Sequence, residues 1–212
     1  MILTLQEWQR EQKSVDDLIV QASSTNCNDE WMPFPIGMSW QFTTLVDKEI
    51  QMGAHTKLLH FAITPSTDLA RRGHQTVNRT TIINTLSQNG FVNQQTDAET
   101  YFSSLPSYKF VISPEGNGID CHRHYEALIA GCIPIVEHNP LVELKYRGCP
   151  ILYTRDYSEI TQSYLEKIYS EMAVREWDFS RLFLSYYDED TQNTIKACGN
   201  YWTNRLVKKN WY

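Results

Sequence analysis

One loop and the helix after it carry residues whose types and spacing could bind a charged ligand. They lie in FVISPEGNGIDCHRHYEALIAGCIPIVE, residues 110–137. Gly116, Asn117 and Gly118 let the backbone approach a ligand closely, because glycine adopts positive φ readily. A helix is expected to begin near Asp120, and its first amide groups together with the helix dipole favour an anion. This loop is therefore a predicted phosphate site.

Two side chains at helical spacing extend the predicted site. Arg123 lies in the first turn and can donate two parallel hydrogen bonds to a phosphate. Glu126 follows three residues later on the same face, where its carboxylate can accept hydrogen bonds from a vicinal diol such as ribose. These residue types predict a nucleotide ligand, with Asp120 as the helix N-cap or a contact to the ligand's far end, and His122 beside the donor.

The same residues also allow a purely structural interpretation. Asp120 can be only a helix cap, and Arg123 and Glu126 can form only a surface pair worth about 0.2–0.5 kcal/mol. The loop matches neither the dinucleotide-binding glycine pattern nor the Walker A pattern. Spacing alone leaves both interpretations open.

The surrounding pattern predicts an α/β fold with a single Rossmann-like parallel sheet flanked by helices and a small N-terminal helical segment. Apolar runs and proline or glycine boundaries alternate with helical patterns from residue 57, which is typical of a parallel sheet that binds ligands at its carboxyl edge. The expected strands are residues 58–63, 91–94, 109–113, 133–137 and 150–154. The expected helices are residues 4–22 and 39–51, the end of 71–90, and residues 97–105, 121–131, 156–174 and 190–207. We predict a helical segment over residues 1–55 and the Rossmann-like domain over residues 56–212.

Composition narrows the class of protein. The chain has 212 residues, a formal net charge of −6 and five cysteines in scattered positions. An acidic chain argues against a nucleic-acid partner, which demands a basic face. Scattered cysteines favour reduced thiols in the cytoplasm over a disulfide framework or a metal site. No apolar stretch is close to the length of about 20 residues that a membrane-spanning helix needs. We expect a cytoplasmic protein with no membrane span, metal or cofactor.

The segment SPEGNGIDCHRHYEALIAGCIPIV resembles the donor-binding motif of GT-B-type glycosyltransferases. It is most similar to the exostosin-like, family 47-like group and its relatives in algae and large DNA viruses. That group carries P-x-G-x-G-x-D/S-x-x-R-x-x-E-A-L-x-x-G-x-I-P-I/V. The resemblance implies that Arg123 faces the diphosphate of a sugar donor and Glu126 binds the ribose. It also implies that Gly116 and Gly118 form the turn and that Pro134 opens the next strand.

The resemblance extends more weakly upstream. A strand, a loop with Arg71 and Arg72, and Arg79 at the start of a helix are similar to a basic region that the family places near the donor phosphates. MPFPIGMSW, residues 32–40, resembles a loop before that domain. The implied activity is inverting, metal-independent transfer of a sugar to a glycan hydroxyl. The implied donor is a nucleoside-diphosphate sugar, with UDP favoured and rhamnose suggested by the viral and algal relatives.

One departure from the family concerns the catalytic base. A GT-B enzyme has two Rossmann-like domains, and residues 1–55 are too few for a second one. Either the acceptor side is reduced to this segment, or the chain is one domain of a larger enzyme, or a partner completes the site. The base is expected in the N-terminal segment or at the exit of the first strand. The candidates are Asp47, His60 and Asp68, followed by Glu49 and His55.

Two other functions remain open from the sequence. Asp188 and Asp190 form a D-x-D pattern that could hold a divalent metal ion on a donor diphosphate, as in GT-A glycosyltransferases. They could equally be an acidic turn at the start of the last helix. The domain could also be a non-catalytic module that binds a sugar nucleotide or a glycan.

Overall fold

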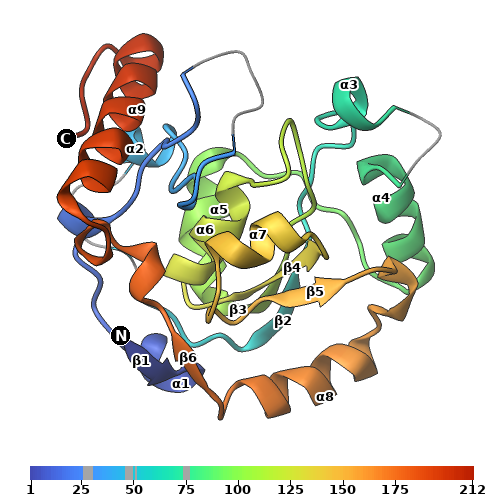
Figure 1. The fold of residues 1–212 in the computed structure, drawn as a ribbon. Helices are drawn as coiled ribbons and strands as arrows, with labels where there is room; N and C mark the ends of the chain where they lie inside the picture. Colours follow the sequence, from blue (N-terminus) through green and yellow to red (C-terminus); the bar gives the residue numbers. More distant parts are fainter. Residues whose placement is uncertain (26–30, 46–49, 51, 74–76) are drawn as a thin grey trace.

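Four parallel strands form the centre of the structure, which is a computed structural model describing residues 1–212 except 26–30, 46–49, 51 and 74–76. Their spatial order follows the chain (Figure 1). They are β2 (Lys57–His60), β3 (Tyr108–Ile112), β4 (Ile133–Glu137) and β5 (Leu152–Thr154). Parallel neighbours require crossover connections, and helices supply them here. The predicted α/β fold, a Rossmann-like parallel sheet flanked by helices, is confirmed.

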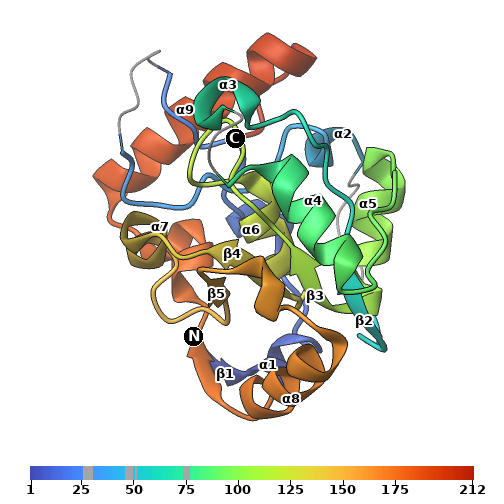
Figure 2. The same ribbon diagram turned by 90° about the vertical axis from the view of Figure 1, so that its right-hand side faces the viewer.

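The helices between and after these strands surround the sheet. In Figure 1, α9 lies on the opposite side of the molecule from α4, and Figure 2 shows α4 in front of the sheet and α8 below it. The helices of this part are α3 (Leu69–Arg72), α4 (Arg79–Gln88), α5 (Ala98–Ser104), α6 (His122–Ile129), α7 (Pro140–Lys145), α8 (Gln162–Met172) and α9 (Glu189–Val207). No helix in the described part of the chain is long and apolar enough to cross a membrane.

The central strands are covered on both faces. Phe110, Val111 and Ile112 of β3 are completely buried, as are Ile133 and Ile135 of β4. This burial explains why both strands read as continuous apolar runs without alternation. The polar residues that follow β3 are therefore placed at the carboxyl edge of a rigid strand.

The helix expected over residues 4–22 is wrong. Only α1 (Leu5–Trp8) forms, and the chain after a short 3₁₀ turn is extended. Leu18 to Ala22 are five consecutive buried residues, which a helix with one buried face does not produce. Leu18 pairs with Phe183, and Val20 pairs with Met38, so neighbours on both sides cover this segment.

Two further expectations about elements change. Residues 91–94 form no strand in the described structure, because the Asn93 side chain, rather than the backbone, hydrogen-bonds both the N–H and the carbonyl of Ile63. The helix expected over residues 39–51 is described only as α2 (Phe42–Leu45), since residues 46–49 and 51 lie outside the described residues.

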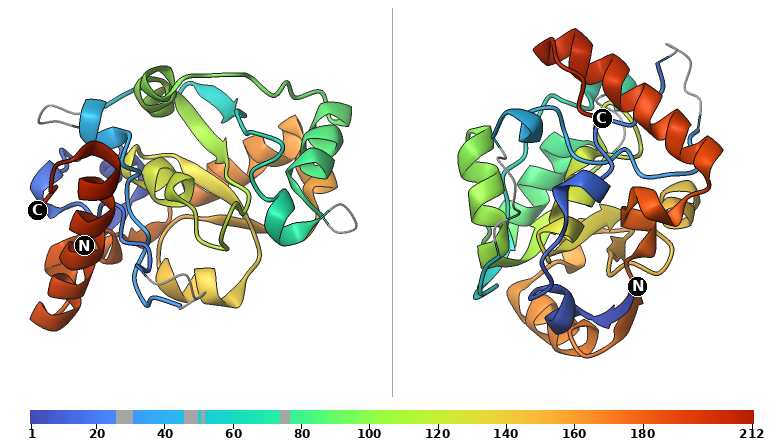
Figure 3. Two further views of the ribbon diagram at one scale, coloured as in Figure 1. Left: turned by 90° about the horizontal axis from the view of Figure 1, so that it is seen from above. Right: turned by 90° about the vertical axis from the view of Figure 1, so that its left-hand side faces the viewer.

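The N-terminal segment shares its core with the sheet. β1 (Ile2–Thr4) pairs antiparallel with β6 (Glu176–Asp178), a second small sheet that was not predicted. Trp8 stacks on Phe179 with ring centroids 4.2 Å apart, and its indole N–H donates to the Leu128 carbonyl at 2.7 Å. The right-hand view of Figure 3 shows β1 and α1 far from α9, and the chain that follows them reaching α9, where the Ser23 carbonyl accepts the Trp202 indole N–H.

Candidate functional site

A cleft of about 1210 Å³ lies at the carboxyl ends of β2 and β3. One side consists of residues 62–64 after β2, Arg71 and Arg79. The glycine loop and the start of α6 lie between the two sides. Residues from 21–24 and 31–41, together with Trp202 and Leu206 of α9, form the other side. This position at the carboxyl edge agrees with where parallel sheets bind ligands.

The start of α6 differs from the starts of the other long helices. Asn78, Asp97, Thr161 and Asp188 each cap a helix through a side-chain oxygen. Among the described residues, the N-cap of α6, Cys121, makes no side-chain capping hydrogen bond. The first amide groups of α6 thus remain available to an anion in the cleft.

Arg123 lines the cleft without an ion-pair partner among the described residues. Its guanidinium donates to the Ala62 carbonyl, and it lies 4.8 Å from the centroid of the Tyr101 ring. The carbonyl and the ring face orient the group but do not neutralise its charge. Arg123 therefore presents a positive charge at the start of α6.

Arg79 is a second cleft arginine without a carboxylate partner in the described part of the chain. It is only 6% exposed, and its guanidinium donates to the carbonyls of Pro114 and Glu115 at 3.2 and 2.8 Å. Burial lowers the pKa of Arg79, and the nearby Arg123 contributes to the lowering. A buried charge of this kind is unfavourable unless a counter-charge binds beside it.

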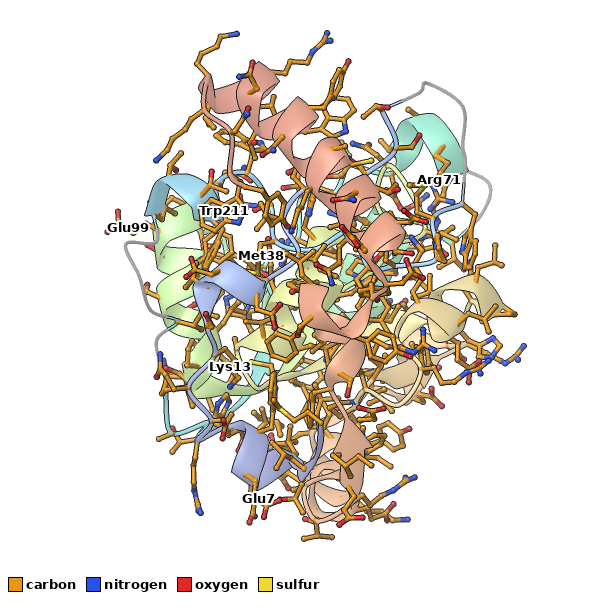
Figure 4. All side chains as sticks on the ribbon, turned by 60° about the vertical axis from the view of Figure 1, so that its left-hand side comes forward. Glu7, Lys13, Met38, Arg71, Glu99 and Trp211 are labelled. Atoms are coloured by element: carbon orange, nitrogen blue, oxygen red, sulfur yellow. The ribbon has the colours of Figure 1, made fainter. Side chains whose placement is uncertain are left out.

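The other two predicted arginines have carboxylate partners. Arg71 lines the cleft from α3 (Figure 4), where it pairs with Glu115 and donates from Nε to the Gly116 carbonyl at 3.1 Å. Arg72 lies outside the described lining and donates to Glu137 at 2.6 Å. Glu137 also accepts the backbone amide of Glu115 at 2.9 Å, next to the glycine loop. Arg72 therefore stabilises the loop through Glu137 and is not part of the described lining of the cleft.

Glu126 lines the cleft and is 4% exposed. Its Oε1 accepts the backbone N–H of Ser39 at 3.0 Å. The buried Tyr101 hydroxyl has no hydrogen-bond partner among the described residues. Burial raises the pKa of Tyr101, and the negative charge of Glu126 raises it further. Glu126 therefore lies between Ser39 of the N-terminal segment and Tyr101 of α5.

Asp120 is not the N-cap of α6, so that alternative is wrong. Its carboxylate accepts the Ile36 amide and the Lys145 ammonium, each at 3.0 Å, and the Tyr146 hydroxyl at 2.8 Å. The chain turns once more after Asp120, and Cys121 occupies the cap position. Asp120 lines the cleft but mainly joins the glycine loop to α7 and to the N-terminal segment.

His122 also faces the cleft. Its Nδ1 lies 2.9 Å from the Gly37 carbonyl, so Nδ1 must carry the proton in this hydrogen bond. Nε2 has no hydrogen-bond partner among the described residues. The imidazole is therefore held in the tautomer whose free nitrogen can accept a proton.

The base candidates occupy other places. Neither His60 nor Asp68 belongs to the described lining of the cleft. His60 is 2% exposed between the Tyr101 and Tyr108 rings, and burial lowers its pKa to about 4. Asp68 is fully buried and accepts the Arg79 amide at 2.9 Å. His55 is buried against the Tyr108 carbonyl, while Asp47 and Glu49 lie outside the described residues.

The D-x-D pattern belongs to a helix start. Asp188 caps α9 by accepting the Thr191 amide at 2.8 Å, and Asp190 lies in the first turn of the same helix. Both residues are outside the described lining of the cleft. The structure thus gives the acidic turn that the sequence allowed as the alternative to a metal site.

Several cleft residues have no signal in the sequence. Tyr101, Trp31, Trp202 and Lys145 line the cleft but belong to no recognisable motif. Trp31 and Trp202 are 171 positions apart in the chain, and only the packing of the N-terminal segment against α9 unites them.

Comparison with known families gives one match. Residues 69–196, more than half of the chain, match the family described as RXYLT1 C-terminal domain. The matched region contains the four predicted arginines, the glycine loop and Glu126. The matched region begins after the segment that contributes residues from 21–24 and 31–41 to the cleft. No curated protein matches the chain.

Proposed function

This chain belongs to the RXYLT1 C-terminal domain family, a xylosyltransferase-related, exostosin-like glycosyltransferase family, and we propose that it transfers a sugar from a nucleoside diphosphate to a glycan hydroxyl. The observation that carries this proposal is a pair of arginines at the start of α6: Arg123 in its first turn and Arg79 beside it. Neither has an ion-pair partner among the described residues. A diphosphate supplies the negative charge that this arrangement lacks.

The proposed donor extends from the glycine loop towards Glu126. Its diphosphate accepts hydrogen bonds from Arg123 and from the first amides of α6, and the Glu126 carboxylate accepts hydrogen bonds from the ribose hydroxyls. UDP is the proposed nucleotide, because the segment from Ser113 to Val136 resembles the donor-binding motif of exostosin-like glycosyltransferases. Two sugars are proposed: xylose, from the name of the matched family, and rhamnose, from the similarity to viral and algal relatives.

In the proposed reaction the acceptor oxygen attacks the anomeric carbon as the bond between that carbon and the diphosphate breaks. The electron pair of the broken bond leaves with the diphosphate, where Arg79, Arg123 and the helix amides stabilise it without requiring a metal ion. Loss of one such donor typically costs about 2.7–4 kcal/mol of barrier. The configuration at the anomeric carbon is inverted, because attack and departure occur on opposite faces.

His122 is our proposed base, in place of His60 and Asp68. Its Nε2 takes the proton of the acceptor hydroxyl, and the bond from Nδ1 to the Gly37 carbonyl holds the ring in the required tautomer. His122→Asn tests this role directly. The asparagine amide can still donate to the Gly37 carbonyl, but the Nε2 atom that would accept the proton is lost. We expect this variant to bind UDP like the wild type but to lose turnover by about 10²–10⁴-fold.

Calorimetric titration of UDP, GDP, CDP and ADP, with Mg²⁺ or with EDTA, tests the donor site. We expect one diphosphate to bind in EDTA and Arg123→Ala and Glu126→Ala to abolish that binding. Arg175→Ala is the matched control, because Arg175 also lies 4.8 Å over an aromatic ring, that of Trp177, but is outside the described lining of the cleft. Binding that requires Mg²⁺ and survives both cleft substitutions contradicts the proposal.

A non-catalytic sugar-nucleotide module is the second candidate. It is favoured by the burial of His60 and Asp68 away from the cleft. Release of UDP from UDP-xylose or UDP-rhamnose separates the two functions. Turnover that His122→Asn removes supports the enzyme, whereas tight UDP binding without turnover of either donor supports the module.

A further inference from the structure

We propose that the side of the cleft formed by Trp31, Trp40, Trp202 and Gln21, here the tryptophan wall, is a subsite for an uncharged saccharide. The binding of a saccharide follows from the residues of this wall. Its identity as the acceptor rests on the proposed function. The wall lies across the cleft from the arginines: in Figure 1, α9, which carries Trp202, and α3, which carries Arg71, are on opposite sides of the loop before α6.

The tryptophans contribute large aromatic side chains to the lining of the cleft. The chain has six tryptophans, and three of them line this wall. Trp31 is 40% exposed, so a large part of its side chain can be reached by a ligand. The indole N–H of Trp202 donates to the Ser23 carbonyl at 3.1 Å, so its ring is fixed in orientation. The faces of such aromatic rings can stack on the apolar C–H face of a pyranose ring.

Gln21 provides an unused polar group beside these rings. It is 7% exposed, and its Oε1 accepts the Trp40 amide at 2.9 Å. Its Nε2 has no hydrogen-bond partner among the described residues, although the side chain lines the cleft. This nitrogen is not among the buried unpaired atoms of the described residues, so it is open to the cleft and can donate a hydrogen bond to a ligand oxygen. The backbone of Gln21 has a φ of 49°, a value that residues other than glycine rarely adopt.

The charge of the wall selects the class of ligand. The described lining residues that residues 21–41 and α9 contribute to this side are uncharged: Gln21, Ala22, Ser23, Ser24, Trp31, Met32, Ile36, Ser39, Trp40, Gln41, Trp202 and Leu206. Among the described residues, the charged Asp120 and Glu126 hydrogen-bond to this side only through the backbone amides of Ile36 and Ser39. The opposite side carries Arg71, Arg79 and Arg123. An anionic ligand is therefore drawn to the arginines, while aromatic faces with amide and hydroxyl groups suit a neutral sugar. His122 lies between the two sides, where an acceptor hydroxyl on the wall would reach it.

The test measures binding of saccharides and of UDP separately. Methyl β-glycosides of xylose, galactose, glucose and N-acetylglucosamine are titrated against the full chain, with and without UDP, by saturation-transfer NMR. The variants are Trp31→Ala and Trp202→Ala, and the matched control is Tyr186→Ala. Tyr186 is an exposed aromatic residue (45%) outside the described lining of the cleft, and its ring packs on Tyr187 and not on a tryptophan of the wall.

We expect at least one glycoside to bind, with a Kd about tenfold higher in each tryptophan variant and unchanged in Tyr186→Ala. UDP affinity should stay within about twofold in all three variants. The subsite is overturned if none of the glycosides binds, if the control weakens binding equally, or if the tryptophan variants lose UDP instead. If a glycoside binds but the wild type takes no nucleotide, the subsite stands and the proposed donor function fails.

Discussion

The backbone amide of Ser39 donates a 3.0 Å hydrogen bond to the Glu126 carboxylate, 87 positions away in the chain. This bond joins the N-terminal segment to the helix that carries Arg123. Asp120 holds the same segment at Ile36, and His122 holds it at Gly37. The motif residues therefore fasten one side of the cleft as well as facing it.

Glu126 can be tested for both roles with two substitutions. We expect Glu126→Ala to lower the free energy of unfolding by about 1–3 kcal/mol, because the buried Ser39 amide loses its acceptor. Glu126→Gln keeps an acceptor oxygen and should be closer to the wild type. Both should weaken UDP binding if this carboxylate binds the ribose. Denaturant unfolding and calorimetry measure the two effects, and equal destabilisation by both variants would contradict the assigned hydrogen bond.

Asp120 and Lys145 form an ion pair whose side chains are 6% and 8% exposed. We expect Asp120→Asn to destabilise the protein by about 3–5 kcal/mol, because it leaves a buried ammonium without its counter-charge. Adding Lys145→Met should recover a large part of this loss. Urea unfolding of the two single variants and the double variant measures the coupling. Simple additivity of the single effects would show that the pair is not coupled.

His60 makes the stability depend on pH. Burial lowers its pKa from 6.5 to about 4, so the unfolded chain binds a proton before the folded protein does. The contribution of neutral His60 to the free energy of unfolding is fully present above pH 6.5. It decreases as the pH falls from 6.5 towards 4, by roughly 3 kcal/mol in total.

His60→Phe should remove that part of the acid sensitivity. Burial also lowers the pKa values of His55 and His124, so both proteins retain some pH dependence and the comparison isolates His60. Thermal or denaturant unfolding between pH 7 and pH 4 provides the measurement. UDP binding should be unchanged, because His60 is outside the described lining of the cleft. Parallel stability curves for the two proteins would refute the assignment.

Asp188 should matter for stability and not for nucleotide binding. Asp188→Ala removes the cap of α9 and is expected to cost about 1 kcal/mol. Asp190→Ala leaves the cap intact and should have a smaller effect. UDP affinity in Mg²⁺ should be unchanged in both variants when measured by calorimetry. A loss of Mg²⁺-dependent binding in either one would revive the metal site.

The pattern of apolar residues and glycines within a few positions was sufficient to predict the strands of the sheet and the loop before α6. The runs that became β3 and β4 are buried on both faces, so the apolar signal was continuous and strong. The sequence misplaced elements whose partners are distant. Val15, Leu18 and Ile19 have helical spacing, but contacts with Met38 and Phe183 hold the chain after Asp17 extended.

By itself, the sequence determined the parallel sheet, the glycine turn and the order of Arg123 and Glu126 on one helix, because these depend on neighbours within a few residues. Only the tertiary structure decided that Arg79 faces the cleft while Arg72 supports the loop, and that His60 is buried. It alone also brought Ser23 to Trp202, 179 positions apart. Such contacts depend on the packing of whole segments against one another, which residue spacing does not encode.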